Sequence, residues 1–263
     1  MSLPPLESTG ARVAADPVLA DAEIGLDRLL MKLRVRDLVS DEEERVLRGA
    51  VGEVKGFGAG RTIIRAGVTV SNCTLLIDGF IARYKDLADG QRQIMEVHVP
   101  GDFLDLHSFL LKRLEHNVGS LTPVRIALVP HDALRQITED HPHLARLLWF
   151  STLLDAAIHR ERILSVGRRS AVARIAHLIC ELKLRLEVIG LSDGSRFALP
   201  LTQTDLADAS GLTAVHVNRM LKRLRDDDLL TFRGGEVTIH DWDRLQRVAE
   251  FSADYLYLER RPR

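Results

Sequence analysis

A short stretch of the sequence, GLTAVHVNRMLKRLR (residues 211–225), carries four basic side chains and no acid. Arg219 is preceded by Asn218 and followed at helical spacing by Lys222 and Arg223. Arginine can donate two parallel hydrogen bonds to guanine, asparagine can pair with adenine, and all basic groups attract phosphate. If this stretch is an exposed helix, these residue types predict that it contacts nucleic acid.

The residues on either side of this stretch meet the requirements of a helix-turn-helix, in which two short helices are joined by a tight turn. Thr202 and Asp205 have the spacing of a capping pair at the start of the first helix. Ala207 is small where the two helices should touch, and Gly211 suits a left-handed turn between them. The side chains expected to face the core are Leu206, Leu212, Val217 and Met220.

With those side chains buried, the opposite face of the second helix is left for DNA. Arg219 and Asn218 would read bases, Val215 would touch a thymine methyl group, and Thr213 at the helix start would meet phosphate. Beyond the helix, TFRGGEVTIH predicts a two-stranded wing with Arg233 near its tip. The residues predicted to bind DNA are Thr202, Gln203, Thr213, Val215, His216, Asn218, Arg219, Lys222, Arg223 and Arg233.

The composition of the whole chain limits the other possibilities. The 263 residues carry a formal net charge of −1, so any footprint for nucleic acid must be local. A hydrophobic content of 46% can form a real core, and the length suggests two modest domains. Cys73 and Cys180 lack CxxC spacing, which argues against a zinc site, an iron–sulfur cluster or a disulfide framework. No signal peptide or membrane span is indicated, so we expect a cytoplasmic protein.

The elements that must position the basic helix begin with a β-rich segment. Ser40 and Glu43 have capping-box spacing, which predicts a short helix. After Lys55, the runs TIIRAGVTV, TLLIDGFIARY and QRQIMEVHV are separated by turn signals such as Asp78-Gly79. VRIALVP, residues 124–130, should close the sheet. Strands of this length and spacing predict an antiparallel sandwich or barrel.

After Pro142 the pattern becomes helical, with apolar side chains at three- and four-residue steps. Trp149 and Leu153 add a second apolar side, so we expect this helix to pack on the barrel and on the same helix of a second copy. Gly167 should end it, and a new helix should follow as far as Gly190. The expected divisions are a disordered lead (1–26), a β-roll sensor (27–140), a dimerisation helix (141–167), a winged helix-turn-helix (168–250) and a tail (251–263).

This α+β order of a jelly-roll-like antiparallel β-roll, a long helix and a winged helix-turn-helix resembles the Crp/Fnr family of bacterial transcription regulators. The resemblance spans roughly residues 27–245 and is sharpest in VPGDFLDLHSF and LTQTDLADASGLTAVHVNRMLKRL. It implies a homodimer that binds a palindromic site in double-stranded DNA and acts with RNA polymerase. The family's recognition helix usually begins Ser/Thr-Arg-Glu-Thr-Val. Thr213 and Arg219 match that pattern, whereas Ala214 and Val215 replace the Arg-Glu pair, which indicates a different half-site.

The resemblance also marks an effector pocket in the β-roll. Members that bind cyclic AMP carry Gly-Glu after Gly-Asp-Phe and then Arg-Ser for the cyclic phosphate. Here Asp105 and Leu106 fall on the Gly-Glu positions, and KRLEHNVGSLTPV contains no Arg-Ser. We therefore expect no dependence on cyclic AMP. The pocket residues that the resemblance indicates are Gly101, Asp102, Phe103, Asp105 and His107.

Other effectors and functions stay open at this stage. His98, His107 and His116 are candidate ligands of a metal or haem, although a barrel histidine more often has a structural role, and we expect no metal or cofactor. The oxygen-sensing branch of the family uses an N-terminal cysteine cluster, which this chain lacks. The rival function is a metal enzyme on a cupin-like barrel, which needs a His-x-His motif within the barrel. The chain has only His141-Pro142-His143, at a helix start, so we expect no enzyme; an adaptor that binds cyclic nucleotides without DNA is a third alternative.

Overall fold

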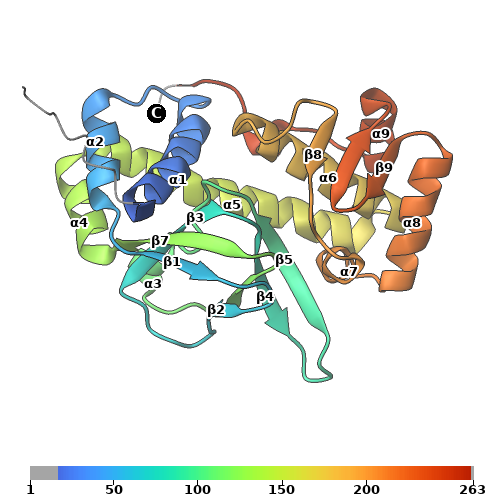
Figure 1. The fold of residues 1–263 in the computed structure, drawn as a ribbon, viewed down its shortest axis with the longest axis horizontal. Helices are drawn as coiled ribbons and strands as arrows, with labels where there is room; N and C mark the ends of the chain where they lie inside the picture. Colours follow the sequence, from blue (N-terminus) through green and yellow to red (C-terminus); the bar gives the residue numbers. More distant parts are fainter. Residues whose placement is uncertain (1–16, 262–263) are drawn as a thin grey trace, which may run out of the picture.

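The computed structural model describes residues 17–261, which form a β-roll, a long helix and a winged helix-turn-helix (Figure 1). The roll consists of two antiparallel sheets. One has the order β1-β7-β3 and the other β2-β6-β4-β5. The strands are β1 (Val54–Phe57), β2 (Thr62–Ile64), β3 (Asn72–Asp78), β4 (Ile81–Asp86), β5 (Arg92–His98), β6 (Asn117–Ser120) and β7 (Val124–Pro130). The α+β class and the antiparallel roll expected from the sequence are confirmed, although β1 and β6 were not anticipated.

The turn between β3 and β4 shows why the sequence has glycine there. Gly79 has φ +86°, and a Cβ atom at this position would lie 2.4 Å from the carbonyl oxygen of Pro123. A side chain would therefore be strained by the backbone conformation and would also clash. The glycine lets β3 and β4 separate into the two sheets, which enclose buried side chains such as Leu76, Ile81 and Ile126.

Helices cover one end of the roll. Ser40 and Glu43 form the predicted capping box at the start of α2 (Asp41–Ala50). The disordered lead was expected to reach residue 26, but α1 (Pro17–Arg34) already begins at Pro17 and packs on β3 through Leu26, Leu29 and Leu30. Apolar side chains at three- and four-residue spacing explain this helix. Residues 1–16 lie outside the described part of the chain. Two further helices are α3 (Ser108–Leu111) and α4 (His131–Asp140).

The long helix α5 runs across the molecule from Pro142 to Arg168 (Figure 1). Gly167 does not end it as predicted. The helix continues to Arg168, and Ser170 then caps α6 (Ala171–Val188). A glycine one residue from a helix end costs little there because the last turn is only partly ordered by hydrogen bonds. The large apolar side chains that α5 exposes are Trp149, Leu153, Ile163 and Leu164.

The C-terminal part is built on α6. Helices α7 (Gln203–Ser210) and α8 (Ala214–Asp226) pack on it, and a three-stranded sheet of order β8-β10-β9 forms the wing. The strands are β8 (Arg196–Ala198), β9 (Leu230–Arg233) and β10 (Glu236–Ile239), and α9 (Trp242–Ala249) follows them. After a short 3-10 turn, η1 (Asp254–Leu256), the chain runs back to α1 (Figure 1). None of the helices in residues 17–261 has the length and apolar character that crossing a membrane requires.

Candidate nucleic-acid interface

The first helix of the motif starts with the capping pair predicted from the sequence. Thr202 Oγ1 accepts a hydrogen bond from the Asp205 amide at 3.1 Å, and Asp205 Oδ2 accepts one from the Thr202 amide at 3.0 Å. Two amides that the helix leaves without intrahelical partners are thereby satisfied. Leu206 and Ala207 are buried behind the cap. The start of α7 is therefore rigidly defined.

The turn between the two helices depends on Gly211. Its φ and ψ are +61° and +44°, and its amide donates to the carbonyl oxygen of Ala207. A Cβ atom would lie 3.2 Å from Cγ1 of Val166 on α5, so the position is restricted by a close neighbour as well as by its backbone angles. Thr213 then caps α8 by accepting a hydrogen bond from the His216 amide at 3.3 Å. Its Oγ1 also lies within hydrogen-bond distance of the His216 Nδ1 atom, at 3.3 Å.

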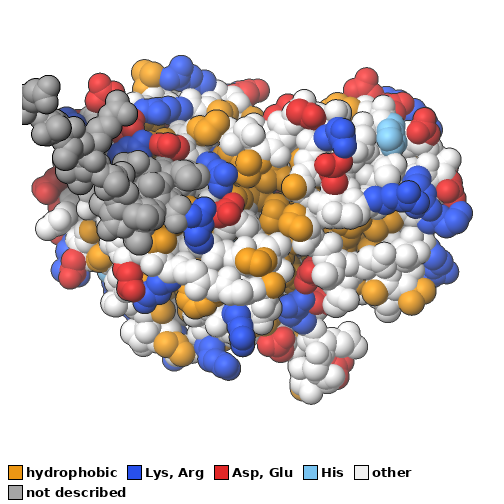
Figure 2. Space-filling model, viewed as in Figure 1, with side chains coloured by type: hydrophobic (Ala, Val, Ile, Leu, Met, Phe, Trp, Pro, Cys, Tyr) orange, Lys and Arg blue, Asp and Glu red, His pale blue; other side chains and the backbone are white. Residues whose placement is uncertain are grey.

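Helix α8 has one buried face and one open face. Val217, Leu221 and Leu224 pack inward, whereas Met220 and Leu212 are only half-buried. The residues of α8 and its N-cap that were predicted to bind DNA are exposed on the other side. These exposed residues are Thr213, Val215, His216, Asn218, Arg219, Lys222 and Arg223. The fold thus brings together side chains able to read bases at one end of the molecule, where basic groups gather (Figure 2).

Two acids at the end of α8 lie close to its basic side chains. The carboxylate of Asp226 pairs with Lys222, and that of Asp227 lies 3.7 Å from Arg223. Residues four apart on a helix are neighbours, which explains both contacts. Among the described residues, Arg219 forms no ion pair. Its guanidinium is therefore ready to meet a ligand without first breaking an intramolecular contact.

Two further predicted residues lie at the margins of this face. Gln203, at the start of α7, accepts a hydrogen bond from Asn218 Nδ2 at 3.4 Å, which links the two helices of the motif. Arg233 is exposed at the end of β9, beside the Gly234-Gly235 turn of the wing. Within the wing, an ion pair of 2.6 Å joins Arg196 of β8 to Glu236 of β10.

Comparison with known proteins identifies both halves. Residues 54–141 match the family model of the cyclic nucleotide-binding domain, and residues 173–248 match that of the Crp-like helix-turn-helix domain. The chain is a transcription regulator of the Crp/Fnr family. The matched ranges coincide with the β-roll and with the winged helix-turn-helix described above.

Relatives of this Crp/Fnr regulator agree with that assignment. The transcriptional activator protein FnrL of Cereibacter sphaeroides is 27% identical over 81% of this chain and 87% of its own length. The nitrogen fixation regulation protein FixK of Bradyrhizobium diazoefficiens is 27% identical over 73% of this chain and 80% of its own length. The solved structure of FixK2 from Bradyrhizobium japonicum is similar, with a TM-score of 0.70 and 25% identity, over 77% of this chain and 99% of FixK2.

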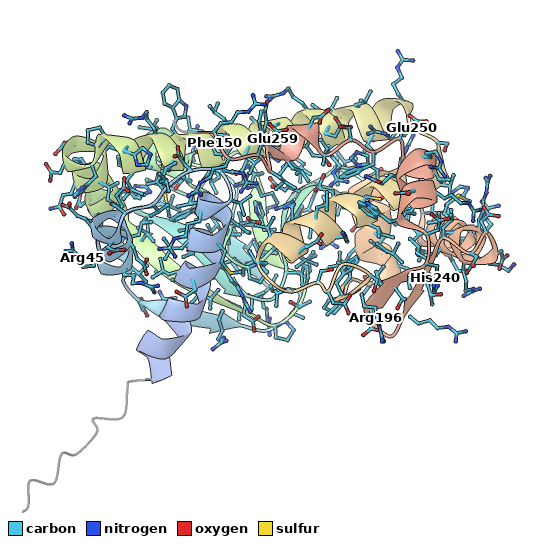
Figure 3. All side chains as sticks on the ribbon, turned by 90° about the horizontal axis from the view of Figure 1, so that it is seen from above. Arg45, Phe150, Arg196, His240, Glu250 and Glu259 are labelled. Carbon is cyan, nitrogen blue, oxygen red and sulfur yellow. The ribbon has the colours of Figure 1, made fainter. Side chains whose placement is uncertain are left out.

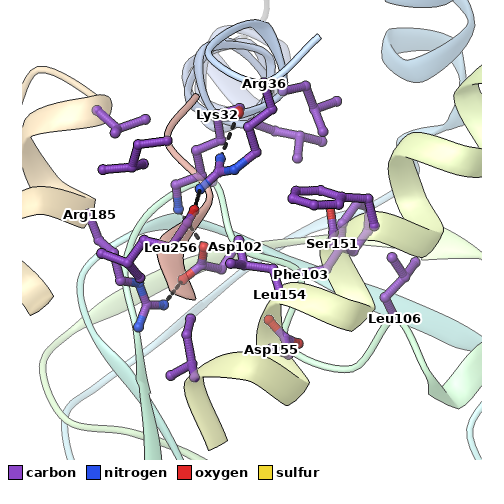
Figure 4. Close-up of a pocket in the computed structure, with 17 residues that line it drawn as sticks. Lys32, Arg36, Asp102, Phe103, Leu106, Ser151, Leu154, Asp155, Arg185 and Leu256 are labelled. Atoms are coloured by element: carbon purple, nitrogen blue, oxygen red, sulfur yellow. Dashed lines mark hydrogen bonds and ion pairs between the residues drawn. The ribbon is translucent and has the colours of Figure 1, made fainter. Parts of the chain in front are cut away.

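The five residues that the sequence indicated for an effector pocket do not surround one cavity in this Crp/Fnr regulator. Gly101, Asp102 and Phe103 line a small hollow between the roll and α6 (Figure 4). Asp105 is buried, and its Oδ1 accepts a hydrogen bond from the Thr74 amide at 2.6 Å. Burial raises the pKa of this carboxyl to about 7. Of the five, His107 alone lines the larger cavity.

That larger cavity lies between the roll and α5 and has a volume of about 640 Å³. Its walls are mainly apolar, with three imidazoles and two guanidiniums. His116 is 3% exposed, and its Nε2 has no hydrogen-bond partner among the described residues. Among the same residues, no group of three or more His, Cys, Asp or Glu side chains could hold a metal ion. The polar and charged lining residues are Arg83, Gln93, His107, Glu115, His116, Thr152, Asp155, His159 and Arg162.

Sequence reasoning missed the ion pairs that join the two halves of the regulator. Asp102 accepts from Arg185 of α6 at 2.7 Å and also pairs with Lys32 of α1. Burial alone would raise the pKa of Asp102, but the two cations outweigh it and hold that pKa well below its usual range. Arg185 is 83 residues and Lys32 is 70 residues away from Asp102 along the chain. No local sequence signal pairs residues so far apart, although Asp102 belongs to the Gly-Asp-Phe motif that the resemblance had singled out.

Proposed function

We propose that this regulator binds a palindromic DNA site as a homodimer, with one α8 in the major groove of each half-site. The observation that carries the proposal is the open face of α8, where Arg219 is exposed and unpaired among the described residues. Arg219 and Asn218 would read guanine and adenine, and Val215, which is 71% exposed, would meet a thymine methyl group. Thr202, Thr213 and Arg233 would contact phosphates on either side of the bases that are read.

The exposed apolar stripe of α5 supports the dimer. Trp149, Ala156 and Ile163 are seven residues apart, and Leu153 lies between the first two on the same side. This is the spacing of a two-stranded coiled coil, in which an identical helix would cover the stripe. Trp149 is 66% exposed and Ile163 is 72% exposed, so a monomer would leave large apolar side chains in water. Two-fold symmetry would then place the two α8 helices about 34 Å apart, one turn of DNA.

We further propose that the cavity between the roll and α5 holds a small effector other than cyclic AMP. A cyclic phosphate would need a guanidinium partner, but Arg83 in this cavity already pairs with Glu96 at 3.1 Å and with Asp155 at 2.8 Å. The apolar walls and the Nε2 atom of His116, which has no hydrogen-bond partner within residues 17–261, favour a ligand with an apolar body and a polar group. Residues 27–140 would thus form the sensor, and residues from 168 onward the DNA-reading domain. Haem is an alternative occupant.

The setting of the proposed function is the cytoplasm, where the protein would act with RNA polymerase on DNA. The experiment that tests the function is selection of bound sequences from a random pool of double-stranded DNA by the full chain. We expect an enriched site with two-fold symmetry and half-sites one helical turn apart. A pool that stays unenriched would contradict sequence-specific binding, and an enriched site without symmetry would contradict the homodimer.

A further inference from the structure

The C-terminal residues 250–261, which we call the C-terminal strap, connect the two halves of the molecule. The strap lies beyond residues 173–248, which match the helix-turn-helix family model. It leaves the DNA-reading domain at Glu250, after α9 (Figure 3), and its Tyr257 contacts Phe150 of α5. The chain then continues to the turn that follows α1, where the Arg261 amide donates to the carbonyl oxygen of Arg36 at 3.0 Å.

At the DNA-reading end, aromatic side chains hold the strap on α6. Phe251 and Tyr255 both contact the ring of His177, with centroids 5.1 and 5.9 Å away. Tyr255 also donates a hydrogen bond to Glu181 Oε2 at 3.0 Å. Burial, followed by the neighbouring carboxylate of Glu181, raises the pKa of the Tyr255 hydroxyl, so it remains a donor.

At the other end, Arg36, in the turn that follows α1, holds the strap. Its side chain is buried and donates from Nη2 to the carbonyl oxygen of Leu256 at 2.9 Å. Leu256 itself is 1% exposed, and Tyr257 makes an edge-to-face contact with Phe150 at 6.0 Å. A segment this well packed is ordered by specific contacts at both of its ends.

Beneath the strap lies the junction between the β-roll and α6. Leu256 and Leu258 line the same hollow as Lys32, Asp102 and Arg185 (Figure 4). The strap therefore covers the ion pairs that join the roll to α6 and limits their contact with water. Ion pairs sheltered in this way are less screened than exposed ones.

We propose that the C-terminal strap positions the DNA-reading domain relative to the β-roll. The strap touches α6, α5 and the turn after α1, whereas the open face of α8 stays exposed with the strap in place. It therefore positions the domain without covering the residues that would read DNA. The proposal rests on the proposed function, because two half-sites at a set spacing require two domains at a set spacing. Without the strap, each DNA-reading domain could move relative to its β-roll. Binding to two half-sites would then have to restrict this motion, and the entropy lost would lower the affinity.

The test compares the full chain with two variants, deletion of residues 251–263 and Leu256→Ala. Arg260→Ala serves as a matched control because Arg260 is exposed on the same segment. Spin labels on Glu139→Cys and Asp243→Cys report the distance between the roll end and the DNA-reading domain. Both positions are exposed, and the native Cys73 and Cys180 are buried, so labelling should be selective. Circular dichroism checks that each variant is folded.

We expect one narrow distance distribution in the parent and in Arg260→Ala, and a broad one in both strap variants. Binding to the selected two-half-site DNA should weaken by about tenfold in the strap variants, while binding to a single half-site stays unchanged. An unchanged distance distribution would overturn the proposal, whether or not the protein binds DNA. Tighter binding by the strap variants would overturn it as well, since the strap would then be inhibitory. Failure of the parent to select any DNA would instead count against the proposed function.

Discussion

Arg92 on β5 donates a hydrogen bond from Nη2 to Asp205 Oδ1 at 3.0 Å, and this contact ties the β-roll to the first helix of the DNA-reading motif. The other oxygen of the same carboxylate closes the capping box with Thr202. Arg92 also donates from Nε to Asp208 at 2.8 Å. The guanidinium of Arg92 thus holds α7 against the roll and also contacts the carboxylate that caps the start of this helix. Strand β5 also supplies residues to the wall of the 640 Å³ cavity, so this one strand contacts both the cavity and α7.

The double role of Asp205 predicts unequal effects for two neighbouring substitutions. Asp205→Ala removes the ion pair and the carboxylate half of the capping box, and we expect it to lower the free energy of unfolding by about 2 kcal/mol. Asp208→Ala removes only a partner of Arg92 and should cost about 1 kcal/mol or less, since Arg92 is partly exposed to solvent. Urea unfolding measures both values. Equal losses would contradict the double role.

Arg219 should carry base recognition, whereas Lys222 should not. We expect Arg219→Ala to lose about 1 to 3 kcal/mol of discrimination at a defined base pair, because a bidentate contact to guanine is lost. Lys222→Ala should weaken binding about equally on all sequences, since its ammonium would contact phosphate and first has to leave Asp226. Competition binding with the selected site and its single-base variants measures the difference. Uniform weakening by Arg219→Ala would reassign Arg219 to phosphate.

Gly211 is predicted to resist replacement even by alanine. The positive φ and the 3.2 Å approach of Val166 should together make Gly211→Ala destabilising by about 1 to 2 kcal/mol. Gly49→Ala is the matched control: Gly49 is exposed on α2, and a Cβ there meets nothing within 4 Å. That change should leave the free energy of unfolding almost unaltered, because Gly49 lies one residue from the end of α2, where helix propensity counts for little. Thermal unfolding should therefore occur at a lower temperature in Gly211→Ala and at nearly the parent temperature in Gly49→Ala.

Asp105 predicts a pH dependence of stability with a definite sign. Its pKa is about 7 in the folded protein, above the unfolded value, so folding favours the protonated carboxyl. The unfolded chain loses this proton first as pH rises, and the stability contribution of Asp105 should therefore fall between about pH 4 and pH 7. Asp105→Asn keeps an acceptor for the Thr74 amide and removes the titration. In urea unfolding, the free energy of unfolding of Asp105→Asn relative to the parent should rise by roughly 1 kcal/mol per pH unit between about pH 4 and pH 7. If the difference between variant and parent stays constant with pH, the raised pKa of Asp105 is contradicted.

Cyclic AMP should not bind with micromolar affinity. Loss of a buried charged contact to the cyclic phosphate lowers affinity by roughly two or more decades. Isothermal titration calorimetry of the full chain with cyclic AMP should show no saturable heat at micromolar concentrations. A micromolar dissociation constant would mean that Arg83 exchanges its carboxylate partners for phosphate.

The sequence was most informative where structure depends on near neighbours. Thr202 and Asp205 are three residues apart, so their capping box could be recognised from spacing alone. The same holds for Gly211, whose left-handed turn follows from its place between two helical patterns. The end of α5 was placed one residue too early, at Gly167 and not at Arg168, because a single glycine near a helix end carries only a small energetic cost. The pairing of Asp226 with Lys222 was also missed, although the spacing of these two residues allows it.

The sequence by itself determined the antiparallel roll, the winged helix-turn-helix and the exposed basic face of α8, because periodicity and turn chemistry act over a few residues. Only the tertiary structure decided which distant residues meet. Arg185 reaches Asp102 across 83 residues, and Arg36 reaches Leu256 across 220. Such contacts depend on how whole elements pack, and a residue's type does not specify a partner so far along the chain. The orientation of the DNA-reading domain relative to the roll is therefore decided by tertiary packing.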